Sequence, residues 1–185
     1  MKISEASKIS IIGGPGTGKS TLADNLGKEL GIPVYHIDGI NYLENWQQRD
    51  KEERDGIIRE IIKKEKWITD GTYRTTLEER VKASDFIIFL DYSMIARLKG
   101  TMTRYIKNNG KEKKEIPGCK EQMNLIFFRF VINWKKTKGY MINDVLNRNS
   151  NKKIIIFKNR KNLNKWYIEQ FGKKIEVSKW EKILK

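Results

Sequence analysis

Residues 13–20 read Gly-Gly-Pro-Gly-Thr-Gly-Lys-Ser, and this stretch decides the fold of the 185-residue chain. It matches the pattern G-x-x-x-x-G-K-[ST], in which glycines let the backbone curl until several N–H groups point at phosphate oxygens. An apolar strand pattern at residues 8–12 leads into the stretch, and a helical pattern at 19–30 follows it, adding the positive end of its dipole. Because both flanks fit, we expect a P-loop that binds a nucleoside triphosphate rather than a chance glycine-rich turn.

The P-loop pattern assigns roles to its polar residues. Lys19 is expected to reach the β- and γ-phosphates, and Ser20 to ligate Mg²⁺. ATP and Mg²⁺ are therefore the expected cofactors. The residues expected to contact the nucleotide here are Gly14, Pro15, Gly16, Thr17, Gly18, Lys19, Ser20 and Thr21. The pattern does not name a second substrate.

Length and composition narrow the class of protein. With three prolines and no internal repeat, residues 1–185 are expected to form a single domain. The single cysteine, Cys119, excludes an internal disulfide and a cysteine-rich zinc site. No apolar run approaches the roughly 18 residues of a membrane span, and no signal-peptide pattern is present. We expect a cytoplasmic protein without a membrane partner, whose oligomeric state the sequence does not indicate.

Positive charge is concentrated in the second half of the chain, which accounts for the net charge of +15. Residues 1–96 contain 14 Lys or Arg and 16 Asp or Glu, whereas residues 97–185 contain 24 and 7. Two interpretations remain open: lysines that solvate helix faces, or a basic face that attracts polyphosphate or nucleic acid. The mixture of Lys and Glu in residues 107–120, without interleaved aromatic residues, weakens the nucleic-acid interpretation.

Strand and helix patterns alternate along the chain, which predicts an α/β fold with a mostly parallel sheet. Short apolar strands are expected at residues 8–12, 34–37, 67–69, 86–90 and 153–157. Helices are expected at residues 19–30, 48–65, 75–83, 93–107 and 121–147, then from Asn162 as N-cap to about Gly172, and again from Ser178. These elements indicate a three-layer P-loop NTPase fold.

The segment at about residues 105–122 interrupts two helices with a polar, lysine-rich sequence and the breakers Asn-Asn-Gly and Pro-Gly. We expect a short helical lid over the phosphates here, because a closed lid would exclude water, which competes with the acceptor for the phosphoryl group. An ordinary surface loop is the alternative.

Three apolar strands are each followed by an aspartate, namely Asp38, Asp70 and Asp91. Ligands of a parallel α/β sheet collect at the carboxyl ends of its strands. Asp70 is the first choice for positioning Mg²⁺, and Asp38 for orienting an acceptor hydroxyl or acting as its base. Turn capping before a glycine is the alternative for both, and Asp91 is expected to be structural. His36, the only histidine, is expected to be a packed residue rather than a catalyst.

Arginines are natural partners of phosphate, because the guanidinium group is always charged and binds in a bidentate manner. Arg74 follows the segment Asp70-Gly71-Thr72-Tyr73 and is expected beside the acceptor. Arg97 and Arg104 are seven residues apart on one predicted helix, hence on one face that leads into the lid. That spacing suits two cations that converge on a triphosphate, although solvated surface residues are the alternative. Arg80 is expected to form a salt bridge.

The order of these motifs resembles the bacterial DNA topology modulation proteins, a branch of the adenylate-kinase-like P-loop kinases. The specific parts are the P-loop and the segment Trp67-Ile-Thr-Asp-Gly-Thr-Tyr-Arg74. The resemblance implies a five-stranded parallel sheet in the order 2-3-1-4-5 and an Mg²⁺ role for Asp70. Thr72-Tyr73 replaces the Phe-Pro of adenylate kinases, and no four-cysteine lid or AMP-pocket sequence is present, so AMP is not implied as the acceptor.

The resemblance also implies roles for individual basic residues. Arg74 would hold the acceptor and the transferred phosphate, and Arg97 and Arg104 would be lid arginines. Asn159 and Arg160 follow the last strand, where this superfamily contacts adenine.

Functions from two classes are consistent with the sequence. The first is an ATP-dependent kinase of a small acceptor, such as a nucleotide or nucleoside. Its catalytic residues are expected to be Lys19, Asp38, Arg74, Arg97 and Arg104, and its metal ligands Ser20 and Asp70. The second is a nucleotide-dependent regulatory protein associated with DNA, without a small-molecule acceptor. An NTPase without any acceptor is a third, less favoured alternative.

Overall fold

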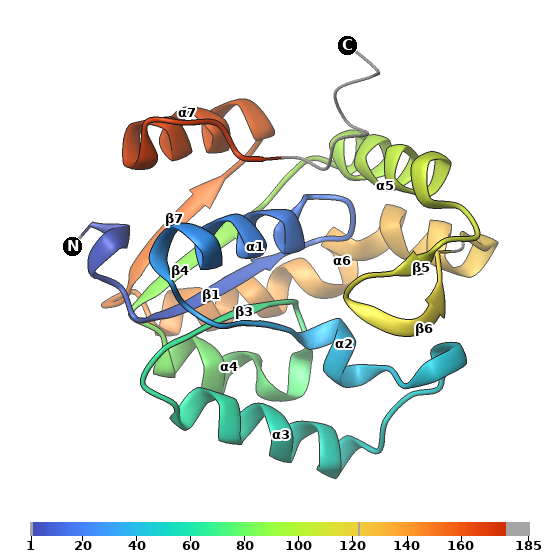
Figure 1. Ribbon diagram of the computed structural model, residues 1–185, viewed down its shortest axis with the longest axis horizontal. Helices are drawn as coiled ribbons and strands as arrows, with labels where there is room; N and C mark the ends of the chain where they lie inside the picture. The colour runs from blue at the N-terminus through green and yellow to red at the C-terminus, as the bar shows by residue number, and fades with distance from the viewer. Residues whose placement is uncertain (1, 122, 177–185) are drawn as a thin grey trace.

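The computed structural model describes residues 2–121 and 123–176. A five-stranded parallel sheet forms its centre (Figure 1), with the strand order β2-β3-β1-β4-β7. The strands of this sheet are β1 (Lys8–Gly13), β2 (Val34–His36), β3 (Trp67–Asp70), β4 (Phe86–Leu90) and β7 (Lys153–Phe157). Because β7 is the fifth strand of the sheet along the chain, the expected fold class and strand order are confirmed.

The helices follow the predicted alternation, with small changes at their ends. They are α1 (Lys19–Leu30), α2 (Ile37–Asn41), α3 (Lys51–Lys63), α4 (Arg74–Ala83), α5 (Met94–Asn108), α6 (Leu125–Arg148) and α7 (Arg160–Phe171), with 3-10 turns η1 (Ile3–Glu5) and η2 (Glu44–Trp46). The expected cap of α7 is corrected: Asn159 is the N-cap, and its side chain accepts a 2.9 Å hydrogen bond from the Asn162 N–H. The helix expected from Ser178 lies outside the described residues.

Helices cover both faces of the sheet, so its central strands are buried on both sides (Figure 1). On one face, α1 and α7 pack through residues such as Leu26 and Tyr167 against Ile11 of β1. On the other face, α4 and α6 pack through Leu77 and Ile142 against alternate residues of β1 and β4. Continuous apolar strands are what such two-sided burial requires.

The expected short helical lid is corrected by the structure. Residues 105–121 instead contain the end of α5 and an antiparallel hairpin of β5 (Glu112–Lys113) and β6 (Ile116–Lys120). Gly110 and Gly118 adopt left-handed φ angles of 72° and 74°, which end a helix and favour turns. Pro117 also lacks the N–H that a continuous helix needs.

The hairpin lies against η2 rather than standing free. Trp46 donates hydrogen bonds from its backbone N–H to Cys119 Sγ at 3.1 Å and from Nε1 to the Lys120 carbonyl at 3.1 Å. The buried Cys119 thiol donates in turn to the Leu43 carbonyl at 3.2 Å. The segment after β2 and the hairpin therefore form one wall opposite the P-loop. Within the described residues, no helix has both the length and the apolarity needed to cross a membrane.

Candidate active site

The P-loop connects β1 to α1 as the motif predicts. Gly16 and Gly18 have left-handed φ angles of 72° and 87°, which glycine adopts without steric cost. The Thr17 hydroxyl and the Lys19 ammonium each donate a 2.9 Å hydrogen bond to the Gly14 carbonyl. Because α1 begins at Lys19, the unpaired N–H groups and the positive dipole end of this helix lie at the loop. The loop thus combines the features of an anion-binding cradle.

Helix α5 supports the P-loop from behind. A Cβ added to Gly100 would lie 2.0 Å from the Gly16 carbonyl oxygen, and one added to Gly14 would lie 2.4 Å from Cδ of Arg97. Trp134 of α6 also contacts Gly14, at 3.2 Å from the same added atom. These close approaches fix the loop in one position against two helices.

A cavity of about 1530 Å³ opens in front of the P-loop at the carboxyl ends of the strands. The predicted site residues that line it are Pro15, Gly16, Gly18, Lys19, Ser20, Thr21, Asp38, Asp70, Arg74, Arg104 and Arg160. Basic residues of the second half of the chain surround it as well, namely Lys99, Lys107, Lys113, Lys114 and Lys138. With Arg104 and Arg160, seven of the 24 Lys and Arg residues in residues 97–185 line this cavity, where their charge favours a polyanionic ligand.

Ser20 and Asp70 meet at the end of β3. The Ser20 hydroxyl donates a 2.7 Å hydrogen bond to Oδ2 of Asp70, and Asp70 is 4% exposed. Both groups offer oxygen, which is the ligand that Mg²⁺ prefers. Burial lowers the pKa of the neighbouring Lys19, while the charges of Asp38 and Asp70 oppose this shift. The pair consequently fits a magnesium ion held beside the P-loop lysine.

His36 has a more specific environment than the packed residue expected from the sequence. Its Nδ1 lies 2.5 Å from Oδ1 of Asp70, and its Nε2 lies 3.2 Å from Oδ1 of Asp24. Burial alone would lower the pKa of His36, but the hydrogen bond and charge of Asp70 and the charge of Asp24 raise it above its ordinary value. The imidazole thus bridges two carboxylates, and it fixes the carboxylate that Ser20 also contacts.

The turn after Asp70 is held by two side chains. The Thr72 hydroxyl donates to the Gly13 carbonyl at 2.9 Å and accepts from the Gly13 N–H at 3.1 Å. Arg80 donates to the carbonyls of Gly71 at 3.0 Å and Tyr73 at 3.3 Å, and burial lowers its pKa to about 10. The expected salt bridge of Arg80 is therefore wrong, since its contacts in the described chain are backbone carbonyls.

The two arginines of α5 occupy different environments. Arg97 is fully buried and donates to the carbonyls of Tyr92 at 2.9 Å and Val131 at 3.1 Å. It lies behind the P-loop and does not line the cavity, so its hydrogen bonds in the described chain are to backbone carbonyls and not to the space in front of the loop. Arg104 lies at the cavity and pairs with Glu121 at 3.1 Å. The two share one helix face, but the P-loop covers that face at Arg97 and leaves it open at Arg104.

The cavity wall includes some of the other predicted residues and leaves others out. Gly14 and Thr17 are buried within the P-loop and do not line the cavity. The Asn159 side chain caps α7 and is likewise absent from the cavity wall. Arg160 does reach the cavity, where its Nη2 would lie 3.4 Å from a Cβ added to Gly18. Asp91 lies outside the cavity wall as well and pairs with Lys135 and Lys158.

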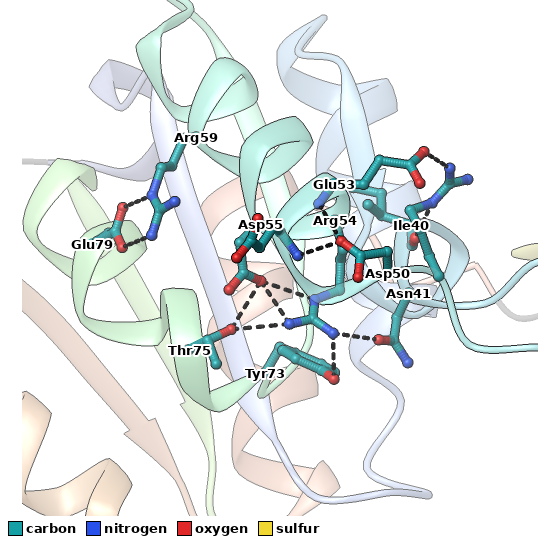
Figure 2. A network of polar contacts seen from close by, with 12 residues as sticks. Ile40, Asn41, Asp50, Glu53, Arg54, Asp55, Arg59, Tyr73, Thr75 and Glu79 are labelled. Atoms are coloured by element: carbon teal, nitrogen blue, oxygen red, sulfur yellow. Dashed lines mark hydrogen bonds and ion pairs between the residues drawn. The ribbon is translucent and has the colours of Figure 1, made fainter.

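A buried arginine that was not predicted from the sequence, Arg54, lies beside the cavity. Figure 2 shows Arg54 of α3 directed toward Asp55, Asn41, Tyr73 and Thr75. Arg54 is 3% exposed, and its hydrogen bonds to Oδ1 of Asp55 measure 2.7 and 2.9 Å. It also donates to the Asn41 side chain at 3.3 Å and to the Tyr73 hydroxyl at 2.7 Å. An arginine in a charged helix gives no signal of such burial, because most such residues are solvated.

Comparison with known proteins adds the following findings. A solved structure of shikimate kinase from Acinetobacter baumannii in complex with shikimate matches with a TM-score of 0.56 and 16% identity, over 91% of this chain and 97% of that one. Shikimate kinase from Bacteroides thetaiotaomicron matches with a TM-score of 0.51 and 17% identity, over 89% and 92% of the two chains. These similarities show a shared fold. No curated protein sequence matches the chain.

A family model described as AAA domain matches residues 8–153. This range begins at β1, contains the P-loop and the cavity residues up to Lys138, and ends at the start of β7. The chain therefore belongs to this family of AAA domains, with the fold of a P-loop kinase.

Proposed function

We propose that the chain is an ATP-dependent kinase that transfers the γ-phosphoryl group to a small acceptor. One observation carries the proposal: the P-loop and the Ser20–Asp70 pair line the same cavity as Asp38 and Arg74. The P-loop and the metal-ligand pair serve a nucleotide. The carboxylate of Asp38 and the positive charge of Arg74 are additional groups that suit a second substrate. The shared fold with shikimate kinases supports a phosphoryl transfer of this kind.

The roles follow from charge and position. The P-loop amides and Lys19 neutralise the β- and γ-phosphates, and Ser20 and Asp70 hold the metal. Magnesium bound there supplies positive charge against the phosphate oxygens. Arg74 and Arg104 line the cavity and stabilise charge on the transferring group. Arg97 packs against Gly14 and Gly16 while Tyr92 and Val131 hold its side chain, and in this role it positions the loop from behind.

The transfer requires one hydroxyl on the acceptor. Its oxygen forms a bond to the γ-phosphorus while the bond to the β,γ-bridging oxygen breaks and ADP leaves. Asp38 lines the cavity and is exposed to it, so its carboxylate orients the hydroxyl and accepts the released proton. The β5–β6 hairpin forms the opposite wall and excludes water from the site in our proposal.

An acceptor screen tests this proposal. ADP release is measured with Mg-ATP and nucleoside monophosphates, nucleosides or small hydroxy acids such as shikimate, against a blank without acceptor. A kinase releases ADP faster with its acceptor than in the blank, and the product carries phosphate. Equal release in every case, with nucleotide still bound, would favour an NTPase without an acceptor.

The charge balance of residues 97–185 favours a second candidate, a nucleotide-dependent protein associated with DNA. This is also what the resemblance to DNA topology modulation proteins would mean. Duplex binding should then weaken steeply with salt and respond to ATP. A titration with duplex DNA at two salt concentrations, with and without ATP, tests it. Absence of binding at physiological salt would exclude this candidate.

A further inference from the structure

The buried Arg54 fixes which way the Asn41 side chain is oriented. A guanidinium group only donates hydrogen bonds, so the Asn41 atom that lies 3.3 Å from Nη1 must be the carbonyl oxygen Oδ1. The amide nitrogen Nδ2 is left as the remaining polar group of this side chain. Asn41 is 3% exposed yet lines the cavity, and no group in the described chain accepts a hydrogen bond from its Nδ2. The cavity wall therefore presents a donor at Asn41.

Arg54 also fixes the direction of the Tyr73 hydroxyl hydrogen. The hydroxyl oxygen of Tyr73 accepts a 2.7 Å hydrogen bond from Arg54, and the guanidinium carbon lies 3.9 Å from the centre of its ring (Figure 2). The hydroxyl hydrogen must point away from Arg54, because two hydrogens cannot occupy the same contact. Tyr73 also lines the cavity, and no described group accepts that hydrogen. The wall therefore presents a second donor at Tyr73.

Moving Arg54 out of these contacts would cost free energy. Its Nε and Nη2 both donate to Oδ1 of Asp55, which is 5% exposed and which also accepts a 2.9 Å hydrogen bond from Thr75. Breaking a buried pair of this kind leaves an uncompensated charge, which is strongly unfavourable. The polarity of Asn41 and Tyr73 is consequently built into the fold before any ligand binds.

Near these two donors the cavity is lined by groups of complementary kinds. Arg74 adds a positive charge, and none of the described residues forms an ion pair with it. Asp38, which only accepts hydrogen bonds, faces the same cavity. One part of the cavity wall thus donates hydrogen bonds and carries positive charge, and another part accepts hydrogen bonds.

We propose that Arg54 sets the acceptor specificity, so that the enzyme selects a molecule with an anionic oxygen group in addition to the hydroxyl that it phosphorylates. Asn41, Tyr73 and Arg74 bind the anionic group, a carboxylate or a phosphate monoester, and Asp38 receives the hydroxyl. A neutral acceptor displaces water from these two cavity-facing donors without pairing them, and donors left unpaired in this way cost binding energy. This inference rests on the proposed kinase function and narrows its substrate class.

Matched pairs of acceptors test the inference. Nucleoside 5′-monophosphates are compared with their nucleosides, and hydroxycarboxylates with the corresponding alcohols, by the KM for stimulated ADP release. The anionic member of a pair should have a KM at least tenfold lower, and the better class distinguishes phosphate from carboxylate. Equal or better use of the neutral member overturns the inference but leaves the kinase proposal standing. If neither member of any pair stimulates release, both fail.

Two variants connect the selectivity to Arg54. Asn41→Asp keeps the shape but replaces the donor with an oxygen, and should raise the KM of the anionic acceptor at least tenfold while binding of a fluorescent ADP analogue is unchanged. Asn143→Asp makes the same chemical change on an exposed part of α6 outside the cavity wall and should change neither value. Arg54→Lys keeps a positive charge beside Asp55 but loses the several N–H donors of the guanidinium group. The ratio of the KM of the neutral acceptor to that of the anionic acceptor should therefore fall toward one. An unchanged ratio in both Asn41→Asp and Arg54→Lys overturns the inference.

Discussion

The Ser20 hydroxyl donates a 2.7 Å hydrogen bond to the Asp70 carboxylate, which links the first turn of α1 to the end of β3. The two residues are 50 positions apart in sequence, and adjacent parallel strands bring them together. His36 contacts the other oxygen of the same carboxylate. The relationship gives the proposed metal position a fixed geometry, with two oxygen ligands and a buried second contact.

Loss of either oxygen should weaken metal binding. In Ser20→Ala and Asp70→Asn we expect the affinity for Mn²⁺ in the presence of ADP to fall by at least tenfold, because a ligand or its charge is removed. Mn²⁺ binding is measured by electron paramagnetic resonance, so the readout does not depend on turnover. Ser150→Ala changes an exposed serine outside the cavity and serves as the control. Unchanged Mn²⁺ affinity in Asp70→Asn would contradict the assignment.

The contact between α5 and the P-loop predicts opposite results for two glycines. In Gly100→Ala the new Cβ would lie 2.0 Å from the Gly16 carbonyl oxygen, so the loop must move. We expect a loss of about 1–3 kcal/mol of stability, as for other overpacked sites, together with weaker nucleotide binding. Gly56→Ala in α3 meets nothing within 4 Å and should raise stability by about 0.5–1 kcal/mol. Chemical denaturation and a fluorescent nucleotide check both values.

The two arginines of α5 should separate stability from turnover. Arg97→Met leaves the carbonyls of Tyr92 and Val131 without their donors, which should cost about 2–4 kcal/mol of unfolding free energy. Arg104→Gln changes a partly exposed side chain and should change stability by less than about 1 kcal/mol. Turnover in Arg104→Gln should nevertheless fall at least tenfold, since a charge at the transferring group is lost. A large loss of turnover without loss of stability in Arg97→Met, with normal turnover in Arg104→Gln, would instead indicate that Arg97 binds the phosphates.

Asp50 predicts a specific dependence of stability on pH. Its Oδ1 accepts hydrogen bonds from the N–H groups of Glu53 at 3.0 Å and Glu52 at 2.8 Å, which lower the pKa of Asp50 below its ordinary value of 3.8. The contribution of the ionised group is therefore complete above the unfolded pKa and is lost as pH falls through the lower folded pKa. Asp50→Asn keeps a capping oxygen without the charge. Between about pH 4 and pH 2 the stability of the wild-type protein should fall more steeply than that of this variant, measured by urea unfolding. Parallel curves of stability against pH for the two proteins would contradict this role of Asp50.

The elements of the sheet could be predicted from sequence because local pattern and burial agree there. Phe86–Leu90 is apolar at each position and is buried on both faces, so its bounds were predicted correctly. The segment around η2 could not be predicted, because Asn45 and Trp46 adopt positive φ angles of 55° and 62° that no local signal requires. Contacts to the hairpin, such as Trp46 Nε1 to the Lys120 carbonyl, hold that conformation.

The site could be predicted in part for a similar reason. The P-loop and Asp70 follow from motif and strand end, since both depend on short stretches of sequence. The position of Arg97 depends instead on how α5 lies across the P-loop, and a spacing of seven residues does not contain that information. Arg54 was missed because its burial depends on α2, α3 and α4 packing together around Asp55.

The central claim, that the P-loop cradle holds a triphosphate, is tested most directly by calorimetric titration of the protein with a non-hydrolysable ATP analogue and Mg²⁺. Lys19→Ala removes the ammonium at the cradle, and Lys82→Ala, which removes a surface ion pair with Glu78 on α4, is the control. The account predicts saturable one-to-one binding in the wild-type protein and in Lys82→Ala, and a loss of at least a hundredfold in Lys19→Ala. Absence of binding heat in the wild-type protein, or equal affinity in all three proteins, would contradict it.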